Sequence, residues 1–351
     1  MKSSSRYLVS FALKLLFILV ILEITFRFLP ATNVPCETFD EKHDLFRFNT
    51  GELRQGLYTY GSFAEIKARW HVNNMGWLSA IDYRYNAQPL VAIIGDSYIE
   101  SLCMEPDRNM TAKLRNHLRG TYDVYSFGIS AASLNSYLHI SRYVRQNFHP
   151  EILVFNIVDG DILDSLEPQR DKYFSYGHGG VIENKVPCES STKPNSINYL
   201  YRKSALLRYL RLNNGFLGKA PVKLATIKEE TLTNEKLYHY RQISSYTFAK
   251  IRQENPGCTV IIVIDAPRND IYLGQTDKVE LNYREVIAEN ARKNGFIVVD
   301  MAEPMTRLFA ANGRMFNFKN NYHWNEYGNQ VVADEIFTKV FKQKGREQAA
   351  R

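Results

Sequence analysis

The chain has 351 residues, of which 45% are hydrophobic and 23% charged, with a formal net charge of +7 at pH 7. This length and apolar content allow one or two folded domains and exclude an intrinsically disordered chain. Lysine and arginine are scattered among acidic residues, so we expect no nucleic-acid binding. A mildly basic body suits an anionic membrane surface or acidic glycans, or serves solubility alone.

The N-terminal stretch is the most apolar part of the chain. Residues 7–29 are long enough to cross a bilayer as a helix. Lys2 and Arg6 precede them, so the positive-inside rule predicts a cytoplasmic N-terminus and a body outside. Glu23 and Arg27 are one helical turn apart and can pair near the far end. A cleaved signal peptide is the alternative, but no convincing small-x-small cleavage site follows, which favours an uncleaved anchor.

Four cysteines would then lie in an oxidising compartment, and their spacing matches no zinc motif. Cys36 and Cys188 both occur in the sequence Val-Pro-Cys-Glu, and both segments are expected to be exposed loops. We therefore predict a disulfide between them. Cys103 and Cys258 fall in apolar segments and are expected to be buried thiols.

From residue 89 onward, short apolar runs alternate with amphipathic segments. The predicted strands are residues 90–94, 124–127, 152–158, 259–264 and 296–300. The predicted helices run from Ser97 to about 118, then over 134–146, 234–253, 277–293 and 326–341. Strands that alternate with helices predict a flavodoxin-like α/β domain over 89–342, a five-stranded parallel sheet with helices on both faces.

Three further regions lie outside this pattern. Residues 30–88 form an aromatic, polar and irregular extension with a turn at Asn73-Asn74-Met75-Gly76-Trp77. The alternation also stops between about 160 and 230. There, Gly177-His178-Gly179-Gly180 predicts a flexible break, and 197–212 an aromatic and basic helix. We interpret this insertion as one wall of the site and residues 343–351 as a polar tail.

The first candidate functional motif is Gly95-Asp96-Ser97, directly after the first predicted strand. Ligands of open α/β sheets bind at the carboxyl ends of the strands, so Ser97 stands where chemistry is expected. The alternative interpretation is that Ser97 merely caps the next helix. The second motif is His323-Trp324-Asn325, before the last helix. His323 alone is consistent with packing; together the two motifs favour a serine nucleophile and its base.

With these motifs placed, residues 72–341 resemble the SGNH (GDSL-type) hydrolases, in particular their membrane-anchored bacterial branch. Four blocks carry the resemblance: Ile94-Gly95-Asp96-Ser97, Ser126-Phe127-Gly128-Ile129-Ser130, Val158-Asp159-Gly160-Asp161, and Asn320-Asn321-Tyr322-His323-Trp324-Asn325. Two blocks depart from the family pattern. Gly160 replaces the asparagine that donates to the oxyanion, and asparagine replaces the carboxylate before the histidine.

The resemblance implies a role for each matching residue. Ser97 would be the nucleophile and His323 the base, with the backbone N–H groups of Ser97 and Gly128 as oxyanion donors. Asn320, or its neighbour Asn321, would orient the imidazole in place of the carboxylate. Asn156, in the middle of a strand, is expected to be a hydrogen-bonded core residue rather than a substitute oxyanion donor.

The implied activity is that of an O-acyl esterase, for O-acetyl groups above all, or of an acyltransferase. It would act on glycans outside the inner membrane, with no cofactor or metal. The alternative is a catalytically impaired protein of the same fold that binds carbohydrate or assists polysaccharide assembly, and it follows from Gly160 and Asn320. The glycan, the acyl group and the oligomeric state do not follow from the sequence.

Overall fold

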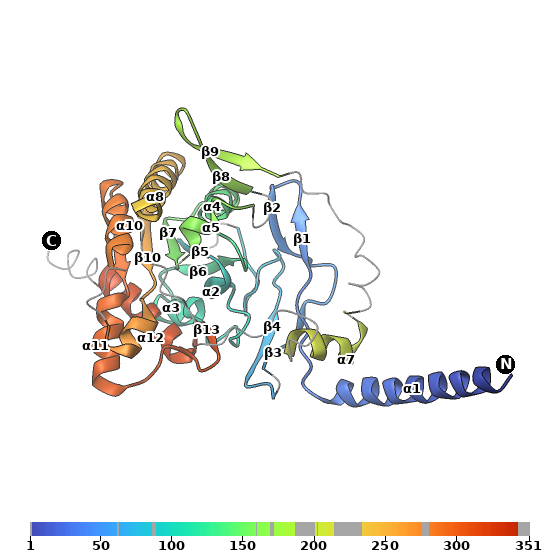
Figure 1. The fold of residues 1–351 in the computed structure, drawn as a ribbon. Helices are drawn as coiled ribbons and strands as arrows, with labels where there is room; N and C mark the ends of the chain where they lie inside the picture. The colour runs from blue at the N-terminus through green and yellow to red at the C-terminus, as the bar shows by residue number, and fades with distance from the viewer. Residues whose placement is uncertain are drawn as a thin grey trace.

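The computed structural model describes residues 2–61, 63–85, 89–158, 160–168, 172–186, 201, 203–213, 234–275 and 281–342. A five-stranded parallel sheet forms its centre (Figure 1). In spatial order its strands are β11 (Ile297–Asp300), β10 (Thr259–Ile264), β7 (Ile152–Ile157), β5 (Leu90–Gly95) and β6 (Asp123–Gly128). Counted along the chain from the β6 edge, the order is 2-1-3-4-5, as in flavodoxin. The predicted fold class is confirmed.

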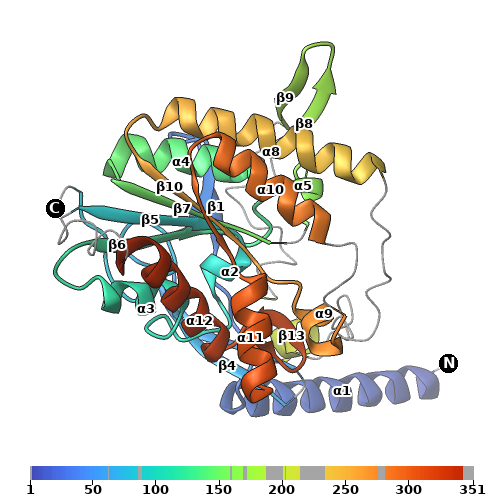
Figure 2. The same ribbon diagram turned by 90° about the vertical axis from the view of Figure 1, so that its left-hand side faces the viewer.

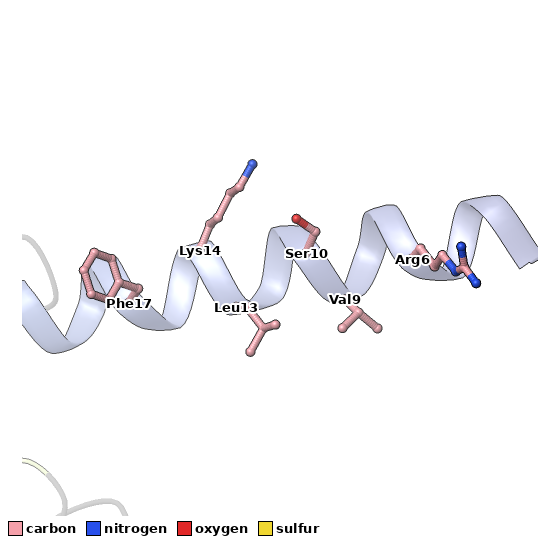
Figure 3. Close-up of a pocket in the computed structure, with 6 residues that line it drawn as sticks. All are labelled: Arg6, Val9, Ser10, Leu13, Lys14 and Phe17. Atoms are coloured by element: carbon pink, nitrogen blue, oxygen red, sulfur yellow. The ribbon is translucent and has the colours of Figure 1, made fainter.

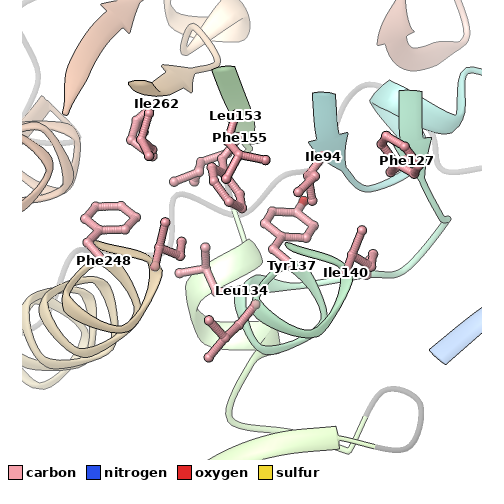
Figure 4. Close-up of a cluster of buried hydrophobic side chains, with 14 of the residues drawn as sticks. Ile94, Phe127, Leu134, Tyr137, Ile140, Leu153, Phe155, Phe248 and Ile262 are labelled. Carbon is pink, nitrogen blue, oxygen red and sulfur yellow. The ribbon is translucent and has the colours of Figure 1, made fainter. Parts of the chain in front are cut away.

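Helices cover both faces of this sheet (Figure 2). Helices α4 (Leu134–Phe148), α8 (Asn234–Glu254) and α10 (Leu281–Lys293) pack on one face, and α3 (Met110–His117) and α12 (Glu326–Ile336) on the other. Because side chains alternate along a strand, β7 contributes Leu153 and Phe155 to the first core and Val154 to the second. Figure 4 shows the first core. Burial on both faces explains why the strands are apolar at almost every position.

The helix predicted from Ser97 to residue 118 is wrong as a single element. The structure has α2 (Ser97–Glu100) and then α3, separated by a loop. Helix α2 ends because Ser101 takes a left-handed conformation, with φ of 57°. Asn109 then caps α3 by accepting a hydrogen bond from the Ala112 N–H at 2.9 Å.

Two regions predicted to be irregular contain antiparallel hairpins. In the N-terminal extension, β1 (Glu37–Asp40) pairs with β2 (Leu45–Phe48), and β3 (Gln55–Tyr60) with β4 (Ile66–His71). In the insertion, β8 (Lys172–Gly177) pairs with β9 (Gly180–Lys185). The glycine-rich segment at 177–180 is therefore the turn of a hairpin and not a break. Gly180 has a φ of 112°, which glycine adopts without steric cost.

The described chain also contains several shorter elements around the core. They are α5 (Asp161–Asp164), α9 (Arg268–Leu273), α11 (Ala302–Asn312), β12 (Asn317–Phe318), β13 (Asn321–Trp324) and the π-helix η2 (Phe337–Lys342). The hairpin of β12 and β13 leads into α12, and α9 follows β10. The β12–β13 hairpin and α9 therefore both lie at the carboxyl edge of the sheet, where ligands bind in this fold.

The N-terminal helix α1 (Lys2–Phe28) projects from the body (Figure 1). Its residues Arg6–Phe28 are long and apolar enough to cross a membrane, as predicted. An open concavity on its surface is lined by side chains including Arg6, Leu13 and Phe17 (Figure 3). It belongs to the surface of the helix and is remote from Ser97. At its other end, α1 contacts α7 (Ala205–Arg208) and the π-helix η1 (Tyr209–Asn213), the described part of the predicted helix at 197–212.

Candidate active site

Ser97 begins helix α2 directly after strand β5, at the point where the strand order reverses. Gly95 ends the strand, and Asp96 caps α2 by accepting a hydrogen bond from the Tyr98 N–H at 3.0 Å. A Cβ atom on residue 95 would lie 2.3 Å from Ile99 Cγ1, so glycine is what allows α2 to turn this closely over the strand. The serine therefore stands at the switch point where ligands bind in doubly wound sheets.

His323 reaches this serine from strand β13, more than two hundred residues later in the chain. Its Nε2 lies 2.8 Å from Ser97 Oγ, and its Nδ1 lies 2.6 Å from Asn321 Oδ1. The His323 backbone N–H donates to the same Oδ1 at 2.9 Å, which identifies that atom as the amide oxygen. Because an amide oxygen only accepts, Nδ1 carries the proton, and the Nε2 lone pair faces the serine hydroxyl.

Asn320 does not have the orienting role predicted for it from the sequence. It is exposed in the turn between β12 and β13, whereas Asn321 begins β13 and contacts the imidazole. Residues two apart on a strand share a face, which places residue 321 beside His323. An amide holds the imidazole tautomer in the same way as a carboxylate, but it supplies no negative charge to an imidazolium.

A buried ion pair holds both neighbours of His323. Asp265 Oδ2 lies 2.8 Å from Arg268 Nη2, and Asp265 Oδ1 accepts a hydrogen bond from Trp324 Nε1 at 3.0 Å. Arg268 Nη1 donates to the Tyr322 carbonyl at 2.6 Å. The residues before and after His323 are thus fixed by the two members of one ion pair.

Tyr98 adds a third contact to the same group. Its hydroxyl donates to the Tyr322 carbonyl at 2.9 Å and accepts from Arg268 Nη2, and its ring lies 5.0 Å from the imidazole, centroid to centroid. Tyr98 follows the nucleophile by one residue. Helix α2, which begins at Ser97, and strand β13, which carries His323, are therefore joined by one hydrogen-bonded network.

The surroundings of His323 disfavour its protonated form. Burial and the nearby Arg268 guanidinium lower the pKa of His323 to about 4. The imidazole is therefore neutral over the whole physiological range, which a general base requires. The same surroundings make the imidazolium that forms during catalysis costly.

Gly128, the predicted oxyanion donor, ends strand β6 and lies against helix α2. It pairs with Gly95 in the sheet, and a Cβ atom on it would lie 2.1 Å from the Glu100 backbone nitrogen. Only glycine allows this approach. The next loop is attached to the same helix, because the Ser130 N–H donates to the buried carboxylate of Glu100.

Gly160 is the N-cap residue directly before helix α5 and has a φ of 97°, a conformation that favours glycine. The residue after it, Asp161, is buried and accepts hydrogen bonds from the Val158 N–H and the Tyr137 hydroxyl, both at 2.9 Å. Burial raises the pKa of Asp161, and the charge of Asp96 raises it further. Gly160 itself brings no side-chain donor.

Asn156 is fully buried in β7, on the face of the sheet that also carries Val154. The sequence predicts a hydrogen-bonded core asparagine at this position. Within the described part of the chain, neither Asn156 Oδ1 nor Nδ2 has a hydrogen-bond partner. Its Cβ lies 3.4 Å from where a Cβ on residue 95 would be, so it packs directly beside the end of the nucleophile strand.

Asp265, Arg268 and Tyr98 were not predicted from the sequence as residues of the site. One signal was available: Asp265 directly follows a predicted strand, at the same sheet edge as Ser97. The ion pair with Arg268 and the contact with Trp324 arise only from tertiary packing.

Cys188 lies outside the described residues, so its disulfide with Cys36 stays a prediction. Cys103 and Cys258 are buried, as predicted. Burial raises the pKa of Cys103 to about 12, which keeps this thiol protonated and unreactive.

No protein-family model and no curated protein sequence matches this chain. Solved structures do. A member of the lipolytic G-D-S-L family from Veillonella parvula is 13% identical, with a TM-score of 0.39, over 72% of this chain and 98% of its own. The lipase/acylhydrolase from Enterococcus faecalis is 10% identical, with a TM-score of 0.40, over 73% and 97% of the two chains. An acetyl xylan esterase from Butyrivibrio proteoclasticus is 12% identical, with a TM-score of 0.39, over 77% and 67%.

The chain resembles the SGNH (GDSL-type) hydrolases. The sheet order, the serine after the first core strand and the histidine before the last helix agree with the resemblance predicted from the sequence. The site supplies a hydroxyl, a neutral base that faces it, and a turn that contains Gly95 beside both.

Proposed function

We propose that this chain is a serine-dependent O-acyl esterase or acyltransferase that acts on glycans outside the membrane. The observation that carries the proposal is the 2.8 Å contact between Ser97 Oγ and a His323 Nε2 that bears no proton. A serine hydroxyl is a weak nucleophile, and a neutral imidazole within hydrogen-bond distance is the usual means of activating it.

The reaction proceeds in two transfers. Ser97 Oγ attacks the ester carbonyl carbon while its proton moves to His323 Nε2, and the N–H groups of Ser97 and Gly128 receive the oxyanion. The bond to the sugar oxygen then breaks, and Nε2 returns the proton to that oxygen. Water, or the hydroxyl of an acceptor glycan, attacks the acyl-serine in the same way and releases the acyl group.

Two features support a substrate outside the membrane. The apolar span of α1 follows basic residues, which favours a body on the extracytoplasmic side. The His323-Trp324-Asn325 segment resembles that of membrane-anchored members, which act on carbohydrate O-acyl groups.

The deciding experiment is labelling of the full chain in nanodiscs with a fluorophosphonate probe, followed by hydrolysis of 4-nitrophenyl acetate. We expect the wild type to be labelled at Ser97. Ser97→Ala should lose both labelling and hydrolysis, because no other group replaces the hydroxyl. Ser175→Ala, on the distant hairpin β8, is the matched control and should behave as wild type. A folded wild-type chain that is neither labelled nor active would refute the proposed enzymatic activity.

A second candidate is a carbohydrate-binding protein without catalysis. It is favoured by the neutral Asn321 beside His323 and by Gly160, since either change removes a contribution that SGNH hydrolases use. Titration calorimetry with acetylated oligosaccharides separates the two. Binding that is unchanged in Ser97→Ala, without any release of acetate by the wild type, would favour this alternative.

A further inference from the structure

Glu23 has an unusual set of partners for a residue inside an apolar helix. Its carboxylate accepts hydrogen bonds from Ser204 Oγ at 2.7 Å and from the N–H groups of Ala205 and Leu206, each at 3.1 Å. Arg27 pairs with it at 3.0 Å. Glu23 therefore caps helix α7, so that a segment of the insertion begins beside the apolar helix itself.

Further contacts attach the rest of this segment to the end of α1. The rings of Phe26 and Tyr209 lie 4.5 Å apart, and Arg208 Nε donates to the Thr32 carbonyl at 2.9 Å. The buried Asn213 accepts from the Thr32 N–H at 3.1 Å. Helices α7 and η1 are thus bound to the membrane-proximal chain along their whole length.

The depth of these contacts follows from helix geometry. Glu23 precedes the last residue of α1 by five positions, which corresponds to about 7.5 Å along the axis at 1.5 Å per residue. If α1 spans a bilayer, the start of α7 lies at the boundary between hydrocarbon and headgroups, and η1 lies just outside it. The peptide N–H groups of α7 would be costly at this depth without the carboxylate that caps them.

The side chains on this segment suit such a boundary. Lys203 and Arg211 are exposed, and so are Leu212, at 38%, and Arg27 in α1. Apolar and basic side chains on one short helical segment are typical of helices that lie in the membrane interface, where the basic groups attract anionic lipids.

The turn after β3 extends the same surface. Asn213 Nδ2 donates to Thr59 Oγ1 at 2.5 Å and contacts the Gly61 carbonyl at 3.4 Å, which fixes the turn against the end of η1. Phe63 in this turn is 92% exposed. Figure 1 shows β3 and β4 beside α7 and the end of α1. A phenylalanine exposed to this degree is free to enter a lipid surface, and Phe is one of the residues that interfacial segments place in the membrane.

We propose that α7, η1 and Phe63, here called the interfacial collar, rest on the bilayer that α1 spans and contact its anionic headgroups. The collar would hold the catalytic domain in one orientation over the membrane. This inference rests on the proposed anchorage of α1 and not on the chemistry at Ser97. The occupant is the lipid surface because the collar is continuous with the apolar helix and carries the opposite charge to anionic lipids.

The test uses tryptophan reporters in the full chain, reconstituted in nanodiscs made with brominated lipids that quench tryptophan on contact. The chain has three native tryptophans, Trp70, Trp77 and Trp324, all 2% exposed or less, so lipid bromines do not reach them and their emission is a constant background that the wild-type chain measures. Phe63→Trp and Leu212→Trp report on the collar, and Phe17→Trp on the span. Tyr238→Trp is the control, since Tyr238 is 52% exposed on α8, at the opposite side of the body from α1 (Figures 1 and 2).

We expect brominated lipids to lower the emission of the added tryptophan, taken as the difference between the variant and the wild-type chain, about twofold or more at both collar positions and in the span, and to leave the control unchanged. Replacing anionic by neutral lipid should weaken quenching at the collar but not at Phe17→Trp. Quenching of Phe17→Trp without quenching of either collar reporter would overturn the collar and keep the anchor. No quenching of Phe17→Trp would overturn the anchor. Loss of collar quenching in the presence of a second copy, at high occupancy per disc, would assign this surface to dimerisation.

Discussion

The electrostatic surroundings of His323 differ from those of a serine–histidine–carboxylate triad. A carboxylate would stabilise the imidazolium, whereas here an amide, Asn321, holds the ring and a guanidinium, Arg268, lies nearby. The ring is oriented for catalysis but is reluctant to accept a proton. We therefore expect a slow enzyme, because the cost appears in the transition state and not in the binding of substrate.

The acidic limb of the pH–rate profile tests this directly. Below the pKa of His323 the imidazole is protonated and cannot accept the serine proton, so activity falls as pH decreases through that value. We expect the midpoint of this fall in kcat/KM near pH 4, far below the ordinary histidine pKa of 6.5. The measurement is hydrolysis of 4-nitrophenyl acetate between pH 3 and 8, referred to the fully folded fraction. A limb between pH 6 and 7 would contradict this electrostatic description.

Asn321→Asp should move this site toward a triad. The new carboxylate stabilises imidazolium, so the pKa of His323 rises, the acidic limb moves to higher pH, and turnover increases by roughly tenfold. Asn320→Asp adds the same charge one residue away on the exposed turn and is the matched control. Equal effects from the two variants would show that net charge, and not contact with Nδ1, determines the rate.

Arg268→Leu removes one partner of a buried ion pair and leaves Asp265 uncompensated. We expect a loss of about 3–5 kcal/mol in the free energy of unfolding, from thermal unfolding of the full chain in nanodiscs. The acidic limb should also move above pH 4, because the guanidinium no longer opposes protonation of His323. The exposed pair of Arg307 and Glu303 provides the control: Arg307→Leu should cost about 1 kcal/mol or less. A destabilised variant with an unmoved limb would limit Arg268 to a structural role.

At the scale of elements, the contact between β6 and α2 determines the shape of the site. Gly128→Ala would place a methyl group against the backbone of α2, which cannot give way like the end of a side chain. We expect a loss of about 3 kcal/mol in stability together with most of the activity. Gly179→Ala is the control, because nothing lies within 4 Å of a Cβ there. Normal stability and activity of Gly128→Ala would exclude this close approach.

The sequence predicts best those elements in which burial alone produces the hydrophobic pattern. The core strands are buried on both faces and read as apolar runs, and α8 is long and regularly amphipathic. Strand β4 was not predicted although it alternates buried and exposed residues, because Lys67 and Arg69 made it read as polar. Helix α2 is four residues long and has no periodicity to detect.

The residues of the candidate site likewise fall into those that the sequence predicts and those that it does not. Ser97 and His323 were predictable because each lies in a short motif at the end of an element. The choice between Asn320 and Asn321 depends on where the β12–β13 turn ends, which local sequence does not determine. Asp265 and Arg268 act on Trp324 and Tyr322 across more than fifty residues, so only the folded chain shows their role.

At the scale of the whole molecule, Glu23 links the apolar helix to the domain. Glu23→Ala should leave the N–H groups of Ala205 and Leu206 uncapped, so their hydrogen exchange should be roughly fivefold faster, as expected for the loss of a helix cap. The measurement is exchange of the full chain in nanodiscs, with Glu303→Ala on α11 as the control. Unchanged exchange at α7 would show that Ser204, which also caps this helix, is sufficient alone.

This link has a practical consequence for recombinant production. A soluble version that begins after the apolar helix, at Pro30, would lack both Glu23 and Phe26 and hence the partners of Ser204 and Tyr209. The insertion would then start with an unsupported helix, and truncation would alter the folded domain rather than merely release it. Expression should therefore retain the last two turns of α1, with their lipid-facing side chains made polar and Glu23 and Phe26 kept.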